Sequence, residues 1–197
     1  ALEFLREQKD SGQPFAMTVG YKAPHGPHTP PPRLANRYSG LKSKDVPNLG
    51  IPLIFDPDKK ADKMDNPNYH RTLSGVDENL GKILDELDRL GIADNTLVIY
   101  TSDNGMFRGE HRLGDKRAAY EESMRVPMLF RYPKLGLPAE VLDQIVLNID
   151  IPPTILDYAG VKIPDTMQGR SWKPLLAGDT KDWRTSFFYC YHLESEY

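Results

Sequence analysis

The stretch TLVIYTSDNG, residues 96–105, decides the fold, because a run of apolar and β-branched residues stops abruptly at Ser-Asp-Asn-Gly. Such a run is typical of a strand that is buried on both faces in a parallel sheet. Asp103 and Asn104 then stand at the carboxyl end of the strand, where open α/β sheets bind their ligands. Carboxylate and amide oxygens suit a hard divalent cation such as calcium or magnesium. Asp, Asn and Gly also favour ordinary turns, so the stretch by itself leaves both interpretations open.

Helices and strands alternate on both sides of this stretch. We expect helices over residues 2–9, 69–90, 118–123 and 152–159, and strands over residues 15–20, 96–101 and 126–132. The strongest helix signal covers residues 69–90, where aliphatic residues recur at helical spacing and Gly91 follows as a stop. The Pro-rich residues 22–68 between the first strand and this helix predict a long irregular segment. The order of elements predicts an α/β fold with a mostly parallel sheet between helices.

Composition excludes several classes of protein. The chain has 197 residues, of which 39% are hydrophobic and 27% charged, which suits one globular domain or a large part of one. Its net charge of −3 offers no whole-chain electrostatic basis for binding nucleic acid or an anionic membrane. We find no apolar stretch of the length that a membrane span requires. The single cysteine, Cys190, excludes an internal disulfide and a cysteine-rich zinc site.

Two loops that follow predicted strands carry groups suited to an anionic substrate. In KAPHGPH, residues 22–28, prolines restrict the backbone around His25, whose imidazole can donate to an oxyanion or act as a general acid. In GEHRLGDK, residues 109–116, Lys116 is a point charge suited to a sulfate or phosphate oxygen. Two alternatives stay open: an ordinary surface loop around His25, and a structural salt bridge between Lys116 and a carboxylate of the following helix.

These segments, in this order, resemble the motifs of the sulfatase family. GYKAPHGPH, residues 20–28, is similar to the histidine loop of that family. Its later motifs are similar to TSDNG, GEH and DKRAAYEESMRVP, at residues 101–105, 109–111 and 115–127. The resemblance extends, with gaps, from about residue 2 to about residue 176. It implies an alkaline-phosphatase-like α/β fold and the hydrolysis of sulfate esters.

The resemblance also implies roles for individual residues. Asp103 and Asn104 would be ligands of one calcium ion, whose remaining ligands we expect upstream of this chain. His25 would hold the sulfate or assist the leaving alcohol, and Lys116 would bind a sulfate oxygen. We expect substrate contacts at three further positions, His28, His111 and Arg112, with His111 either near the substrate or in the layer behind it.

One central element of the family pattern has no match. The family nucleophile is a formylglycine made from the Cys or Ser of a Cys/Ser-x-Pro-x-Arg motif, and no such motif occurs here. Cys190 is followed by Tyr-His-Leu and does not fit it. The early acidic metal ligands of the family are also unmatched. We therefore expect an incomplete sulfatase-like catalytic domain over residues 1–176, the start of a C-terminal segment over residues 177–197, and no turnover by this segment alone.

Three functions stay open at this stage. The leading hypothesis is a calcium-dependent sulfatase that acts on a sulfated glycan or small-molecule ester and is periplasmic or secreted, as family members commonly are. The first alternative is a phosphodiesterase or phosphonate monoester hydrolase of the same superfamily. The second is a non-catalytic sulfatase-like domain. No nucleic-acid partner and no membrane span are expected.

Overall fold

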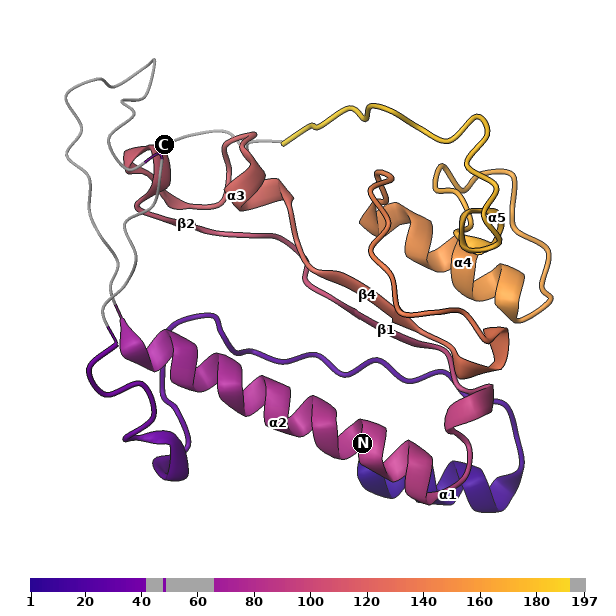
Figure 1. Cartoon of the computed structure of the whole chain (residues 1–197), viewed down its shortest axis with the longest axis horizontal. Coiled ribbons are helices and arrows are strands. Elements are labelled where there is room, and N and C mark those ends of the chain that lie inside the picture. Colours follow the sequence, from indigo (N-terminus) through magenta and orange to yellow (C-terminus); the bar gives the residue numbers. More distant parts are fainter. Residues whose placement is uncertain (42–47, 49–65, 192–197) are drawn as a thin grey trace. The chain divides into compact units, whose positions relative to one another are not determined.

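The computed structural model describes residues 1–41, 48 and 66–191 (Figure 1). The chain forms two compact units, residues 1–137 and residues 138–197. The first unit holds helices α1 (Leu2–Ser11), α2 (Pro67–Arg89) and α3 (Glu121–Met124), and the second holds α4 (Ile151–Tyr158) and α5 (Lys173–Leu176). None of the helices in the described part of the chain is both long and apolar enough to cross a membrane. The expected domain boundary near residue 176 stays a prediction.

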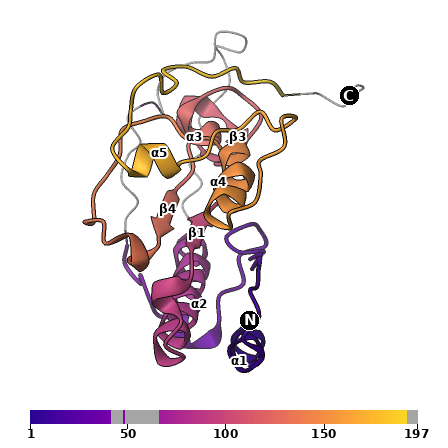
Figure 2. The same ribbon diagram turned by 90° about the vertical axis from the view of Figure 1, so that its right-hand side faces the viewer.

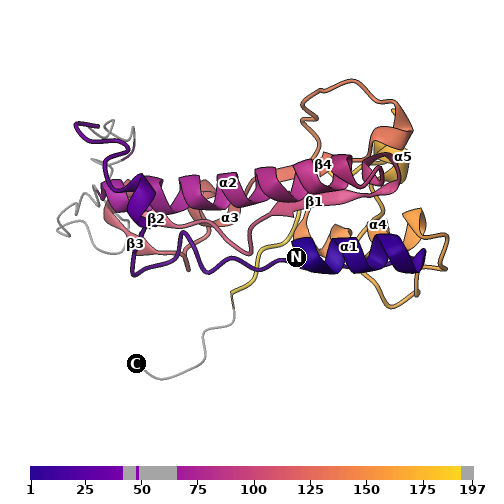
Figure 3. The ribbon, with the colours of Figure 1, turned by 90° about the horizontal axis from the view of Figure 1, so that it is seen from below.

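Helices α1 and α2 form the core of the first unit. The predicted helices over residues 2–9 and 69–90 are confirmed with ends that differ by one or two residues. The side chain of Asn66 caps α2 by accepting a hydrogen bond of 3.0 Å from the Asn68 N–H. Leu5 of α1 and Leu87 of α2 belong to one buried cluster, and Val98 packs against it. The two helices lie side by side in Figure 3. This packing places the long helix directly behind the strand that the sequence singled out.

A buried carboxylate ties the two helices together. Glu86 of α2 is 7% exposed and accepts hydrogen bonds of 2.7 Å from Arg6 of α1 and of 2.7 and 2.6 Å from Arg89. The hydrogen bonds from Arg89, and then those from Arg6, lower the pKa of Glu86 from 4.5 to about 2. Glu86 is therefore ionised throughout the physiological range.

Two short antiparallel sheets make up the strands of the described residues. Strand β1 (Val98–Thr101) pairs with β4 (Met128–Arg131), and β2 (Phe107–Arg108) pairs with β3 (Gly114–Asp115) (Figures 1 and 2). The strands predicted over residues 96–101 and 126–132 are confirmed within shorter bounds. Their pairing differs from the parallel arrangement that the buried run of residues 96–101 predicts. Both described sheets are antiparallel.

Residues 15–20 form no strand, which corrects the prediction for this segment. Phe15 and Met17 pack against the core of the first unit, while Ala16 and Thr18 are exposed, so the alternation of an extended chain is present. A strand also requires backbone hydrogen bonds to a neighbour, and this segment pairs with none of the described strands. The alternation of buried and exposed side chains therefore marks an extended segment that forms no backbone hydrogen bonds to a described strand.

The remaining short elements refine the predicted helices. Helix α3 begins at Glu121, three residues later than predicted, because the backbone of Tyr120 is extended and the Ser123 hydroxyl bonds back to Ala118 O. The predicted helix over residues 152–159 is confirmed as α4, one residue earlier. Single 3-10 turns occur at Pro32–Leu34, Ala93–Asn95, Glu110–Arg112, Pro133–Leu135 and Asn148–Asp150.

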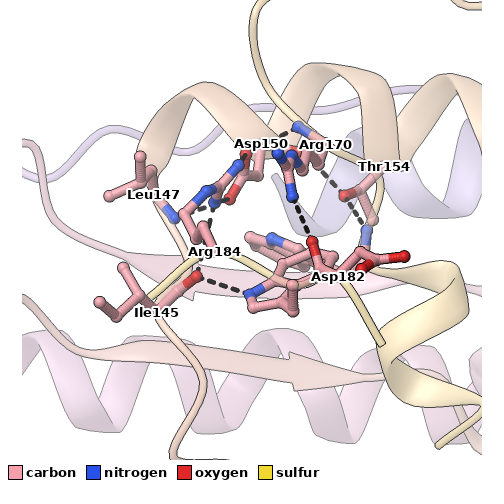
Figure 4. Close-up of polar contacts among 9 residues, drawn as sticks. Ile145, Leu147, Asp150, Thr154, Arg170, Asp182 and Arg184 are labelled. Carbon is pink, nitrogen blue, oxygen red and sulfur yellow. Dashed lines mark hydrogen bonds and ion pairs between the residues drawn. The ribbon is translucent and has the colours of Figure 1, made fainter. Parts of the chain in front are cut away.

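The second unit is organised around Asp150, which is fully buried at the start of α4. Its carboxylate accepts hydrogen bonds of 2.8 Å from the backbone N–H groups of Leu147 and Arg170. Arg184 binds it with both terminal nitrogens, one at 2.8 Å (Figure 4). The Asp150 carbonyl accepts 2.6 Å from the Thr154 hydroxyl. One residue therefore joins three distant segments of this unit.

These contacts keep Asp150 ionised. Burial by itself would raise the pKa of Asp150, but the hydrogen bonds from Arg184 and from the backbone of Arg170 and Leu147 outweigh it and lower the pKa. A buried charge of this kind is stable only while its partners remain.

The lowered pKa of Glu86 makes the stability of the first unit depend on pH. A carboxylate whose folded pKa is about 2 adds stability above its ordinary pKa of 4.5, and this stability is lost as the pH falls toward 2. We expect Glu86→Gln to be less stable than the wild type at neutral pH, with the difference shrinking between pH 4.5 and about 2. Urea denaturation followed by circular dichroism measures this. Asp77→Asn, an exposed site on the same helix, is the control, and a difference that stays constant with pH would contradict the assignment.

Removing the partner of Asp150 tests the second unit. Arg184→Ala leaves a buried carboxylate without its cation, so we expect a loss of about 3–5 kcal/mol in the free energy of unfolding. Trp172 and Trp183, the two tryptophans of the chain, both lie in this unit, so tryptophan fluorescence in urea reports on it. The control Lys173→Ala removes a more exposed ion pair with Asp157 and should cost less than about 1 kcal/mol. Equal losses in the two variants would rule out the central role of Asp150.

Candidate functional site

Asp103 and Asn104 directly follow β1, as the sequence predicts. The carboxylate of Asp103 is exposed, and one of its oxygens lies 3.3 Å from the Ser102 hydroxyl. The amide nitrogen of Asn104 donates to Gly105 O at 2.6 Å. No residue in the described part of the chain donates to the Asn104 side-chain oxygen. Both residues thus present an oxygen at the end of the strand.

This pair has the ligand chemistry of a calcium site but supplies only part of a coordination shell. Calcium takes six to eight oxygen ligands. Within residues 1–41, 48 and 66–191, no group of three or more His, Cys, Asp or Glu side chains is arranged to hold a metal ion. Asp103 and Asn104 fit such an ion as two of several ligands, and their role stays a prediction.

Helix α3 lies against the backbone that follows this pair. The Gly105 N–H donates to Ser123 O at 2.8 Å. A Cβ atom on Gly105 would lie 2.1 Å from Glu122 O, far inside van der Waals contact. Only glycine fits between the strand end and the helix, so the two segments have one fixed spacing.

The turn from Gly109 to Asp115 has an unusual backbone. Three residues other than glycine have positive φ: His111 at 52°, Arg112 at 57° and Asp115 at 76°. Such conformations are strained for L-residues and persist where surrounding contacts hold them. Lys116 follows this turn directly, so the contacts that hold the turn also fix the position of the Lys116 backbone.

His111 is the residue that these contacts hold. Its Nε2 lies 2.9 Å from the amide nitrogen of Asn48 and 3.4 Å from a carboxylate oxygen of Glu122. The same Asn48 amide donates to the other oxygen of Glu122. The imidazole stacks on Tyr120, with ring centroids 4.1 Å apart and an interplanar angle of 24°. We call His111, Glu122, Asn48 and Tyr120 the His111 cluster.

Among the residues that the structure describes, no carboxylate pairs with the ammonium group of Lys116. Four carboxylates lie within six residues of it, and each binds another group: Glu110 binds Arg108 N–H, Asp115 binds Arg117, Glu121 binds Arg125, and Glu122 lies in the His111 cluster. Among the described residues, Lys116 has no ion pair or hydrogen bond of its own. The salt bridge that the sequence left open as an alternative does not form within this part of the chain.

The histidines of the first loop lie in different surroundings. His25 is exposed, and both of its hydrogen bonds stay within its own loop, from its N–H to Lys22 O at 2.9 Å and from Nδ1 to Gly26 O at 2.8 Å. His28 is half-buried with its ring edge toward Tyr69, and its buried Nδ1 has no hydrogen-bond partner among the described residues. Arg112 is half-buried in the strained turn. The roles of these three residues stay predictions.

The His111 cluster was not predicted from the sequence. Glu122 was expected only as a possible partner of Lys116, and Asn48 lies within the segment predicted to be irregular. Asn48 is 63 residues from His111 and 74 from Glu122, and local periodicity carries no signal for contacts at such separations. A short motif such as GEH followed by YEE marks the two ends of the cluster without revealing that they touch.

Two family models match the chain. One, described as N-sulphoglucosamine sulphohydrolase, C-terminal, matches residues 109–196. The other, described as type I phosphodiesterase / nucleotide pyrophosphatase, matches residues 20–128, which is more than half of the chain. Together they cover the histidine loop, the strand end, the strained turn and α3.

Similar proteins agree with these matches. The chain is 44% identical over 128 residues to an N-acetylglucosamine-6-O-sulfatase of Bacteroides thetaiotaomicron, covering 64% of this chain and 23% of that protein. It is 33% identical over 210 residues to an extracellular sulfatase SULF-1 homolog of Drosophila melanogaster, covering 95% of this chain and 18% of that protein. The chain thus spans about a quarter or less of the length of these two curated relatives.

A solved structure supports the fold. BT4656, solved in complex with its substrate D-glucosamine-2-N,6-O-disulfate, matches 99% of this chain and 55% of its own, with a TM-score of 0.76 and 28% identity. The α/β, alkaline-phosphatase-like fold expected from the sequence is confirmed by this likeness.

The close approach at Gly105 generates a stability prediction. Gly105→Ala places a methyl group against the backbone of α3, so we expect a loss of about 1–3 kcal/mol in the free energy of unfolding. Urea denaturation followed by circular dichroism measures it. Gly114→Ala is the matched control, because the added methyl group would meet nothing within 4 Å. Two equally stable variants would show that α3 is not held against the strand end.

Proposed function

This chain belongs to the sulfatase family, and we propose that the whole protein hydrolyses sulfate esters, with a sulfated carbohydrate as its substrate. Two named relatives support the proposal, since one is a sulfatase of N-acetylglucosamine and the solved neighbour has a disulfated glucosamine as its substrate. Both substrates are sulfated amino sugars.

The observation that carries this proposal is that Lys116 forms no ion pair within residues 1–41, 48 and 66–191. A sulfate ester presents an anion whose negative charge spreads over its oxygens as the ester bond breaks. A preorganised cation at this position stabilises that charge, and it does so most strongly where no carboxylate competes for it. All four carboxylates near Lys116 in the sequence bind other groups. The ammonium group is therefore available for an anionic ligand.

The other site residues take complementary parts in this proposal. His25, held between prolines, donates a hydrogen bond to the sulfate or a proton to the leaving alcohol oxygen. His28, His111 and Arg112 contact the substrate or support the residues that do. The buried Nδ1 of His28 has no hydrogen-bond partner in the described part of the chain, which favours a polar ligand at that position, because a buried polar atom without a partner is costly.

Asp103 and Asn104 would hold one calcium ion together with further oxygen ligands. When bound, the ion supplies positive charge that polarises the sulfate oxygens. The proposed nucleophile is a formylglycine that residues 1–197 do not supply, because they contain no Cys/Ser-x-Pro-x-Arg motif. For this reason we propose that residues 1–197 do not turn over substrate by themselves.

A second candidate function is the hydrolysis of a phosphodiester or phosphonate monoester. The match of residues 20–128 to the phosphodiesterase model favours it. Both reactions require a site for a tetrahedral anion, so Lys116 would serve either one. The choice of substrate separates the two candidates.

We place the protein in the periplasm or outside the cell. The support is the name of the Drosophila relative, an extracellular sulfatase homolog.

A substitution at Lys116 tests the proposal in the full-length protein. We expect Lys116→Ala to lower kcat/KM for N-acetylglucosamine 6-sulfate by about 10²- to 10³-fold, since one charge-stabilising group is removed. Lys134→Ala is the control and should leave kcat/KM unchanged, because Lys134 is exposed and, within the described residues, its ammonium group donates to the Asn95 side-chain oxygen at 3.2 Å.

The substrate series decides between the candidates. A wild type that cleaves a phosphodiester or phosphonate but no sulfate ester would favour the second function. A Lys116→Ala variant with unchanged kcat/KM would remove Lys116 from the site.

A further inference from the structure

Glu122 contacts both the strained turn that precedes Lys116 and the strand end that carries Asp103 and Asn104. Its side chain reaches His111 and Asn48, and its backbone lies against Gly105. We propose that Glu122 is a positioning residue that fixes the turn before Lys116 relative to the Asp103–Asn104 strand end. This inference rests on the proposed function, in which Lys116 binds a sulfate oxygen.

The strain of the turn is the first argument. His111, Arg112 and Asp115 all have positive φ, a strained backbone conformation that persists only where the surrounding structure holds it. The side chain of His111 is held on several sides. Its N–H donates to Asn48 O at 3.2 Å, its ring stacks on Tyr120, and its Nε2 faces Glu122 and Asn48. These contacts favour one conformation of the turn.

The burial of the pair is the second argument. The side chains of His111 and Glu122 are 14% and 23% exposed, whereas those of the neighbouring pair Arg125 and Glu121 are 82% and 73% exposed. Screening by water makes the outer pair weak, while the inner pair is partly withdrawn from solvent. Of the two adjacent glutamates on this short helix, Glu122 therefore forms the stronger interaction with its partner.

The backbone of α3 is the third argument. Gly105 packs so closely against Glu122 O that a single Cβ would not fit, and its N–H binds Ser123 O at 2.8 Å. The position of α3 relative to the strand end is thus fixed. The Glu122 side chain extends from the same helix to His111, so it links the turn to the strand end and opposes a displacement of the turn.

The engagement of both carboxylate oxygens of Glu122 is the fourth argument. Its two carboxylate oxygens face Asn48 and His111. A carboxylate six residues from Lys116 would otherwise be a competitor for the ammonium group. The His111 cluster therefore orients the turn and also keeps Glu122 engaged elsewhere.

Sulfate affinity measures this role directly. In the full-length protein, isothermal titration with inorganic sulfate reports on the anion site, and kcat and KM for N-acetylglucosamine 6-sulfate report on turnover. We expect Glu122→Ala to weaken sulfate binding and to lower kcat by on the order of 10- to 100-fold, as loss of an orienting partner does in comparable sites. Glu122→Gln keeps an acceptor for Asn48 and should stay within about threefold of the wild type, the cost of about one neutral hydrogen bond.

Controls separate positioning from general stability. Glu121→Ala, on the same helix, should leave sulfate affinity unchanged. The thermal unfolding of each variant shows whether it is folded at the assay temperature. If Glu122→Ala unfolds, Asn48→Ala removes the cluster from its other side and should weaken sulfate binding in the same way.

The outcomes are distinct. A wild type that hydrolyses no sulfate ester overturns the proposed function. An active wild type whose Glu122→Ala variant binds sulfate equally well overturns the role of Glu122 alone. A Glu122→Gln variant as impaired as Glu122→Ala would also overturn it, because the charge and not the hydrogen-bonded geometry would then be required.

Discussion

The approach of Gly105 to α3 is the constraint on which the rest of the site depends. At this point the backbone of the strand end meets the backbone of a helix with no side chain between them. On one side of the contact lie Asp103 and Asn104, and on the other lies Glu122 with its link to His111. A single missing Cβ therefore sets the spacing between the candidate cation ligands and the turn that leads to Lys116.

Both compact units use the same device to join distant segments, a carboxylate withdrawn from water and bound by arginine. Glu86 joins α1 to α2 in the first unit, and Asp150 joins three segments in the second. In each case the hydrogen bonds lower the pKa of the acid. In both units, polar contacts therefore fix the packing of the described elements together with the apolar residues.

Local patterns predicted the parts of this fold that local physics controls. The helical spacing of residues 69–90 and the apolar run of residues 96–101 became α2 and β1 because each signal lies within one element. Pairing depends on neighbours instead. The alternation in residues 15–20 was real, yet it formed no described ladder, and the described strands paired antiparallel where a buried run favoured parallel pairing.

The site divides in the same way. The oxygen pair at the strand end and the position of Lys116 were readable from the sequence, because both follow directly from strand ends and residue chemistry. The contact of Asn48 with His111 and Glu122 was not, because it closes a loop of more than sixty residues. Whether Lys116 forms an ion pair could also not be predicted, since that depends on which groups the four neighbouring carboxylates bind.

The left-handed backbone of the turn also limits how this sequence can vary. β-Branched residues are strongly disfavoured at positions 111, 112 and 115, where φ is positive, and glycine, asparagine, aspartate and histidine adopt such a backbone more readily than most residues. The backbone conformation alone thus restricts which substitutions these three positions accept. Diversification among related chains has more freedom in segments whose backbone is ordinary, such as the Pro-rich stretch before α2.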